Sequence, residues 1–167
     1  MKLHKSIVII IITIVLSSCG SVSKVMEQSA LPTPDVGIEV QNQKYLEVAA
    51  PDGWNSFKTN KSVSLLIRNI SDTQIIAEPD FGARIFVCTT DKWIEVKNKT
   101  VYLSESPFTL DPNKNFDTTK IVSFVVHPEL PDDSVSSEIR IFIVGTLLEN
   151  EQESKKVASY IDLKLNP

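Results

Sequence analysis

The sequence predicts an all-β domain, a single antiparallel sandwich of about seven to nine short strands behind a signal peptide and a flexible tether. Valine and isoleucine are abundant, and no long stretch rich in alanine, leucine and glutamate suggests a helix. Apolar residues alternate with polar ones over short segments, and turn residues separate these segments at fairly regular spacing. This combination is typical of sandwiches and barrels.

The amino-terminal residues have the layout of an export signal. Lys2 and Lys5 form a short basic region, and an aliphatic run follows over residues 7–16. A membrane-spanning helix needs about 20 apolar residues, so this run is too short to span a bilayer. Its length suits the apolar core of a signal peptide.

The run ends in Leu16-Ser17-Ser18-Cys19, which resembles the lipobox of bacterial lipoproteins. This resemblance covers about the first twenty residues. It implies that the Cys19 thiol carries a diacylglyceryl group and that signal peptidase II cuts between Ser18 and Cys19. Two or more acyl chains hold a protein stably on a membrane. The alternative is an ordinary signal peptide that happens to contain a cysteine, because small serines also suit a secretory cut.

The order of segments predicts the domain organisation and the location. We expect a signal peptide over residues 1–18, a flexible lipidated tether over 19–36 and the sandwich over 37–167. Pro32 and Pro34 exclude a continuous helix in the tether. The protein would then sit on the outer face of a cell membrane or an outer membrane. Gly20 and Ser21 lack the aspartate that often retains lipoproteins at the inner membrane.

Charge and length restrict the partners. The chain has 167 residues and a net charge of −4. Removing residues 1–18 would take away Lys2 and Lys5 and would leave 15 basic and 21 acidic residues. An acidic surface argues against a nucleic-acid partner. The remaining length is enough for one domain with a proper core.

Period-two alternation identifies the strands. The last pair is the clearest hairpin, with Ile139, Ile141 and Ile143 facing one way and a return strand at 157–165. Between them, residues 149–156 are predicted to form a charged loop. For residues 44–50 the pattern does not decide between a strand and a loop. The other expected strands lie at 38–41, 62–70, 74–77, 82–89, 92–96, 101–103 and 119–127.

Two segments resemble bacterial immunoglobulin-like domains. The strand and turn at 65–72 end in Arg68-Asn69 and Ser71-Asp72, and 110–113 has the leucine and proline that precede a later strand. The resemblance implies an immunoglobulin-like sandwich. The cysteine pair of antibody domains is missing, because Cys88 is alone once Cys19 is lipidated. We expect Cys88 to be a small core residue.

Catalytic patterns are absent from the sequence, so we expect no enzyme and no cofactor. The only histidine after the signal peptide is His127, no Gly-x-Ser-x-Gly elbow occurs, and no glycine-rich phosphate loop is present. We expect His127 to lie at the surface. Acidic pairs at Asp132-Asp133 and at Glu151 and Glu153 have no aromatic neighbours, so solvated loop charge is the favoured interpretation over a glycosidase pair.

A weak calcium candidate lies in the segment 111–117. Its oxygen-bearing side chains recur at every second position, as in calcium loops. Phe116 stands where an EF-hand needs glycine and Val122 where it needs glutamate, so a plain turn is the favoured interpretation. The four candidate ligands are Asp111, Asn113, Asn115 and Asp117.

The two tryptophans are the remaining candidates for binding. Trp54 follows a Pro-Asp-Gly turn and is a candidate platform for a sugar ring or a protein partner, whereas Trp93 opens a strand and is expected in the core. The leading hypothesis is therefore a lipid-anchored binding or scaffolding module of the cell envelope. The alternative is an adhesin-like or inhibitor-like domain that presents loops to a protein or glycan. A hydrolase with dispersed carboxylates ranks third.

Overall fold

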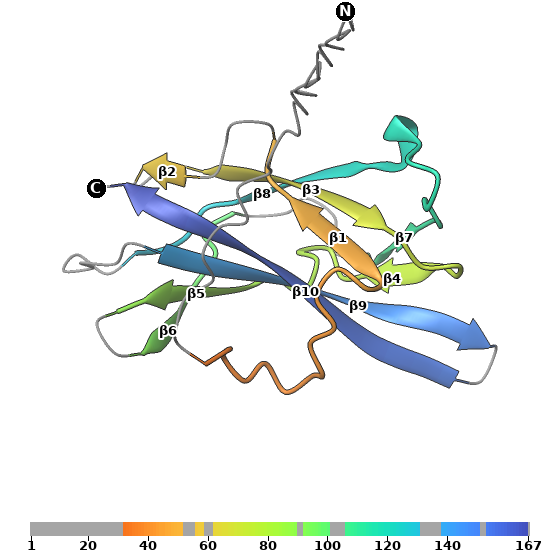
Figure 1. The fold of residues 1–167 in the computed structure, drawn as a ribbon, viewed down its shortest axis with the longest axis horizontal. Helices are drawn as coiled ribbons and strands as arrows, with labels where there is room; N and C mark the ends of the chain where they lie inside the picture. The colour runs from red at the N-terminus through yellow and green to blue at the C-terminus, as the bar shows by residue number, and fades with distance from the viewer. Residues whose placement is uncertain are drawn as a thin grey trace, which may run out of the picture.

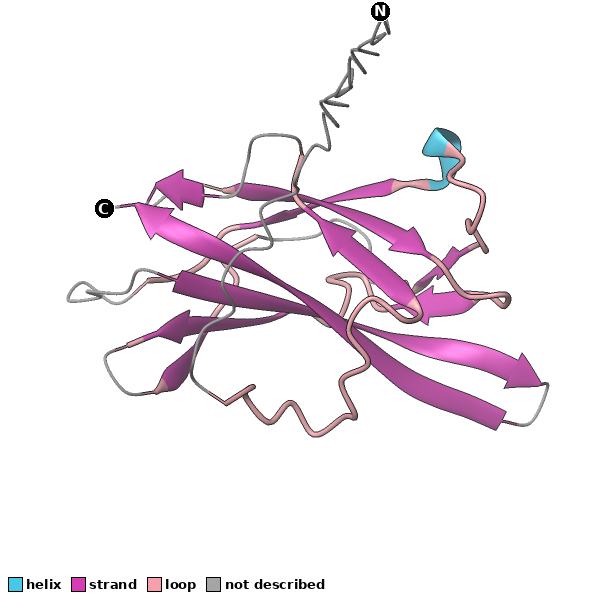
Figure 2. Ribbon diagram, viewed as in Figure 1, coloured by secondary structure: helices cyan, strands magenta, loops and turns pink. Residues whose placement is uncertain are grey.

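The structure is a computed structural model of the chain, and the parts that it describes contain ten strands (Figure 1). The described residues are 32–51, 56–58, 62–89, 92–100, 106–130, 138–150 and 153–166. The strands are β1 (Leu46–Ala49), β2 (Ser56–Lys58), β3 (Val63–Asn69), β4 (Ile75–Ala77), β5 (Arg84–Cys88), β6 (Trp93–Val96), β7 (Phe108–Leu110), β8 (Val122–Val126), β9 (Glu138–Asn150) and β10 (Glu153–Asn166). One short 3-10 helix, η1 (Thr118–Lys120), precedes β8 (Figure 2).

The strands form two sheets that pack face to face. The smaller sheet has the order β1-β3-β8, and all of its pairings are antiparallel. The larger has seven strands in the order β2-β10-β9-β4-β7, with β5 also pairing with β9 and with the edge strand β6. Within it, β2 and β10 are parallel, and the other pairs are antiparallel.

This topology confirms the predicted all-β sandwich. In an immunoglobulin-like domain, strands A, B and E share one sheet and C, F and G share the other. Here β1-β3-β8 takes the places of A, B and E, while β5-β9-β10 takes those of C, F and G. The ten strands exceed the predicted seven to nine, because short segments such as β2 and β7 carry too little alternation to be recognised in the sequence.

The core lies between the sheets and follows the predicted alternation. In β3, Val63, Leu65 and Ile67 are buried, and in β9, Ile139 and Ile141 are buried opposite them. Within the larger sheet, β9 and β4 approach closely at Gly145, where an added Cβ would lie 2.5 Å from Cγ2 of Ile75. A larger residue at Gly145 would therefore clash with the neighbouring strand.

The prediction of a charged loop over residues 149–156 is wrong. β9 continues to Asn150 and β10 begins at Glu153, so both strands run through most of that segment. Strands in a two-stranded extension expose both faces to water, where charged side chains carry no burial penalty. The ammonium of Lys155 also has a partner, because it lies 5.6 Å from the ring centre of Tyr45.

The outer face of the larger sheet is covered by the segment before β1. In Figure 1 this orange segment runs from the β5–β6 side of the molecule to the start of β1. Val36 is 6% exposed and packs with Phe86 and Phe142. Packing thus extends at least as far back as Pro32, into the last five residues of the expected tether. Residues 1–31, which include the lipobox, lie outside the described residues.

Candidate functional site

A hollow of about 330 Å³ opens on the outer face of the smaller sheet. Its apolar wall contains Ala49 from β1, Leu66 from β3 and Ile121 from the segment before β8. Glu47 and Arg68 lie beside this wall, and Phe116 closes one side. We call this feature the Phe116 hollow. Side chains alternate between the two faces of a strand. The lining residues of β1 and β3 therefore face outward, because their neighbours along each strand point into the core.

Phe116 is the most exposed of the large apolar side chains that the structure describes. Its side chain is 59% exposed and its φ angle is 56°, in the left-handed region that favours glycine. An aromatic residue in that conformation is strained by about 1 to 3 kcal/mol, and such strain concentrates at functional sites. Core packing does not hold this ring, which lies over the Arg68 guanidinium, so Phe116 is a candidate for binding.

The turn around Phe116 is held from both ends. Asn113 is 3% exposed, its Nδ2 donates to the carbonyl of Asp117 at 2.8 Å, and its Oδ1 accepts from the Asp117 amide at 2.6 Å. Asp117 in turn caps η1, accepting from the amide and hydroxyl of Thr119 at 2.9 and 2.7 Å. These bonds lower the pKa of Asp117 below its ordinary value. The backbone that displays Phe116 is therefore fixed before any partner arrives.

Arg68 fills the floor beneath the aromatic ring. Its guanidinium centre lies 4.8 Å from the ring centre of Phe116, and its Nε donates to Glu47. Its Nη1 also donates to the Asn113 carbonyl at 3.2 Å. Because Glu47 neutralises it, Arg68 contributes a flat cation–π surface more than a net charge. Among the described residues, the lining of the hollow is thus largely apolar, and its carboxylate Glu47 is paired with Arg68.

The four calcium candidates do not converge in the structure. Asp111 accepts from Gln74 Nε2 at 2.9 Å, Asn113 points into the turn and Asp117 caps η1. Asn115 is exposed. No group of three or more His, Cys, Asp or Glu side chains suited to a metal occurs in the described part of the chain. The alternating oxygens reflect a capped turn.

The remaining predicted residues are dispersed. His127 is half-buried at the end of β8, where its Nδ1 lies 3.3 Å from the Ser62 hydroxyl. Cys88 is also half-buried, and its Sγ lies 3.3 Å from the Thr89 carbonyl oxygen. Glu153 begins β10. The other named residues lie outside the described residues: Ser18, Cys19, Trp54, Asp132, Asp133 and Glu151.

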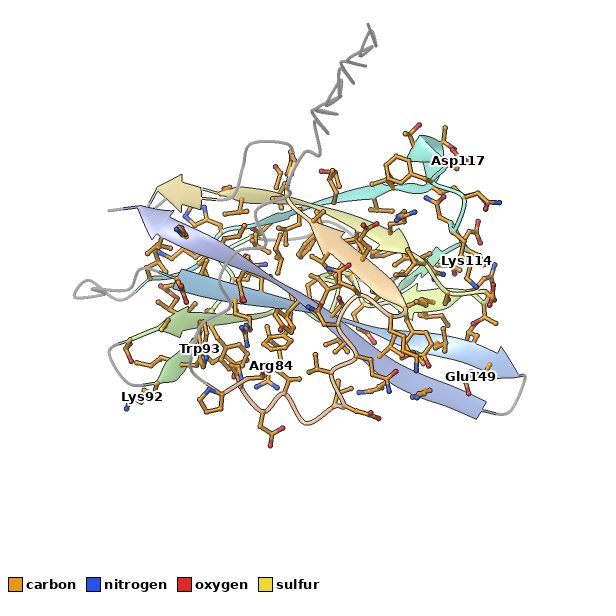
Figure 3. The ribbon with its side chains drawn as sticks, viewed as in Figure 1. Arg84, Lys92, Trp93, Lys114, Asp117 and Glu149 are labelled. Atoms are coloured by element: carbon orange, nitrogen blue, oxygen red, sulfur yellow. The ribbon has the colours of Figure 1, made fainter. Side chains whose placement is uncertain are left out.

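Trp93 lies on the outer face of the larger sheet and not in the main core. It is half-buried at the start of β6, beside a second hollow of about 350 Å³. Below it, Arg140 is 2% exposed and pairs with Asp162 through two bonds of 2.6 and 2.8 Å. Burial opposes the charge on Arg140, but the bonds to Asp162 outweigh it and raise the pKa of the guanidinium. Figure 3 shows Trp93 and Lys92 at the opposite side of the molecule from Asp117.

One signal in the sequence could have identified the Phe116 hollow. An aromatic residue stands within the polar turn 111–117, at the position where glycine is expected. An aromatic side chain placed where the backbone favours glycine is costly, so it implies a role for the ring. The pairing of Arg68 with this turn had no such signal, because it depends on long-range packing.

Comparison with known proteins establishes no family. No protein family model matches the sequence, and no curated protein is significantly similar to it. Among solved structures, the archaellum periplasmic stator protein FlaG from Sulfolobus acidocaldarius is 12% identical, with a TM-score of 0.35, over 70% of this chain and 99% of that one. A likeness at this level does not establish a shared function. No helix in the described ranges is long and apolar enough to cross a membrane.

Proposed function

We propose that the chain is a lipid-anchored, extracytoplasmic binding module of the cell envelope and that the Phe116 hollow receives a protein partner. The observation that carries this proposal is Phe116 itself, an exposed aromatic ring held in a glycine-like conformation beside an apolar hollow. Aromatic and arginine side chains at well-packed hollows dominate protein interfaces. A volume of about 330 Å³ suits one or two apolar side chains of a partner.

The polarity of the hollow favours a protein over a glycan. Sugar hydroxyls need several unpaired hydrogen-bonding groups, whereas the charged groups in this hollow already bond to each other and to the Asn113 carbonyl. A hydrolase is disfavoured for a related reason. Among the described residues that line the hollow, Glu47 is the single carboxylate, and it is held by Arg68. An adhesin-like domain that presents the 111–121 turn to a glycan is the second candidate.

The anchoring half of the proposal comes from the sequence. The basic start, the short apolar run and Leu16-Ser17-Ser18-Cys19 together resemble a lipoprotein signal. Residues 20–31 then separate Cys19 from the packed part of the chain. Twelve residues span at most about 40 Å when fully extended, so the sandwich would remain close to the membrane.

One experiment tests both halves. A photo-crosslinking amino acid is placed at position 116 in cells that are fed a labelled fatty acid, with Cys19 intact or as Cys19→Ala. We expect lipid label and a discrete crosslinked species from the intact chain, and loss of the label in Cys19→Ala. The crosslinker at the exposed position 164 of β10 is the matched control.

The outcomes separate the alternatives. A crosslinked species that protease digests but glycosidase does not identifies a protein partner, and the reverse identifies a glycan. Lipid label retained in Cys19→Ala would contradict the anchor. Equal crosslinking at positions 116 and 164 would contradict the Phe116 hollow as the binding surface.

A further inference from the structure

The larger sheet carries a second surface on which the chain has laid its own amino-terminal segment. We call Pro32–Val36 the strap. Val36 packs in one cluster with Phe86 and Phe142, and the Thr33 hydroxyl accepts from Arg140 Nη1 at 3.2 Å. The strap therefore binds the face through one apolar and one polar side chain.

Beneath the strap lies a surface with the composition of an interface. The Arg140 guanidinium lies 4.2 Å from the ring centre of Tyr160 and 5.0 Å from that of Trp93. Asp162 fixes the guanidinium from β10 through two bonds. Tryptophan, tyrosine and arginine are the residues that most often supply binding energy at protein interfaces. An ordinary solvent-facing side of a sheet has no need of this cluster.

The strap is attached in a way that allows it to leave. Pro32 and Pro34 have no N–H to donate, and the Gly37 amide bonds to the Asp35 side chain at 2.8 Å. Among the described residues, the first backbone pairing with the sheet after the strap is the parallel bridge between Val40 and Ala158, where the Gln41 amide donates to the Ala158 carbonyl at 3.2 Å. Gly37 has a φ of 70° with open space where a Cβ would lie, so it can serve as a hinge. Release of the strap breaks no pairing of the sheet.

The strap also fills its groove incompletely. The hollow of about 350 Å³ lies between the strap and the β5–β6 hairpin, with Phe86, Lys92 and Trp93 on the hairpin side. Figure 3 shows Trp93 and Lys92 together there. The Trp93 Nε1 is buried without a hydrogen-bond partner in the described structure. A buried N–H without a partner destabilises the docked position of the strap. Release of the strap would let water bond to this N–H.

We infer that this groove is a second binding site, for an extended proline-containing segment of another protein, and that the strap is its internal ligand. Extended proline segments are rigid before binding and dock on aromatic grooves at low entropic cost. The strap has this composition, because Pro32 and Pro34 line the same hollow as Trp93 and Phe86. As a tethered competitor, it lowers the apparent affinity for the outside segment by the fraction of chains that are open. The inference does not depend on the Phe116 hollow.

A rescue experiment in trans tests this inference. The mature lipidated protein in detergent carries Trp54→Phe, so that Trp93 is its single tryptophan, and acrylamide quenching reports on the cover over Trp93. Val36→Asp should undock the strap and raise the quenching constant about threefold. A synthetic peptide of residues 30–38 should then restore protection, and the same peptide with aspartate in place of Val36 should not. The matched protein control is Val125→Asp on β8, because Val125 is 38% exposed on the opposite sheet.

Three results would overturn the inference. They are unchanged quenching in Val36→Asp, failure of the peptide to restore protection, and a dimer of the unmodified protein in which a second copy supplies the strap. Should Val36→Asp fail to fold by circular dichroism, Thr33→Ala replaces it, since Thr33 is exposed and its loss removes only the bond to Arg140. That variant should show the same peptide-reversible quenching with a smaller rise.

Discussion

The two outer faces of the sandwich carry the same motif in two different states. On each face an arginine pairs with a carboxylate across neighbouring strands and lies over an aromatic ring. The Arg140 side chain is 2% exposed and its partner Asp162 is 14% exposed, whereas Arg68 and Glu47 are 16% and 35% exposed. Arg140 is covered by the rings of Trp93 and Tyr160 and by the strap through Thr33, whereas Arg68 has the exposed ring of Phe116 over it.

The difference in exposure implies different roles for the two ion pairs. A covered ion pair has lost its water, so each partner depends on the other and removal of one leaves a buried charge. An open ion pair keeps most of its water and contributes little to stability. The Arg68–Glu47 pair can therefore exchange its bonds for those of a partner. The Arg140–Asp162 pair can do so only after the strap is released.

The largest expected effect is the loss of Arg140. Arg140→Ala should destabilise the fold by about 3 kcal/mol, because it leaves Asp162 unpaired beneath the strap. Equilibrium urea unfolding of the mature protein would measure the change. Arg68→Ala is the matched control on the open face, and we expect it to cost less than about 1 kcal/mol.

A double variant sharpens this comparison. Arg140→Ala with Asp162→Ala should recover part of the loss, since no unpaired charge then remains. Equal destabilisation by Arg140→Ala and Arg68→Ala would show that the strap does not distinguish the two faces.

The second prediction concerns the strained turn of the open face. Phe116→Gly should unfold at higher denaturant concentration than Phe116→Ala, by about 1 kcal/mol in free energy, because glycine adopts the φ of 56° without strain. With the photo-crosslinking amino acid moved to the exposed position 115, both variants should lose crosslinking to the partner, because both lack the ring. A glycine variant that is less stable than the alanine variant would contradict the strain at this position.

The sequence was sufficient to predict the sandwich, because alternation in strands such as β3 directly specifies which side chains face the core. It was not sufficient for either outer face. Arg140 stands in a visibly alternating strand, but its partner Asp162 is 22 residues away and depends on the register of β9 and β10. Val36 looked like part of a spacer, because its contacts with Phe86 and Phe142 are distant in the chain. Long-range register and packing leave no local pattern.

The candidate binding residue was missed for a different reason. In the sequence, the segment 111–117 has the alternating oxygen side chains of a calcium loop, and Phe116 is a departure from that pattern. The φ angle of Phe116 reveals backbone strain, and this strain indicates a functional role for the residue. The predicted platform Trp54 lies outside the described residues, and that prediction stays untested.

The smallest expected effect is an acid titration at the tip of the open face. The hydroxyl and amide of Thr119 bond to Asp117 and hold its pKa below the ordinary value of 3.8. A carboxylate whose pKa is lower in the folded state stabilises the fold above its unfolded pKa, and this contribution is lost as the pH falls through the folded pKa. Thr119→Ala should therefore move the NMR titration midpoint of the Asp117 carboxyl carbon upward, towards 3.8. Thr118→Ala, beside it on η1, should leave the midpoint unchanged, and an equal shift in both variants would mean that the Thr119 hydroxyl does not hold the turn that displays Phe116.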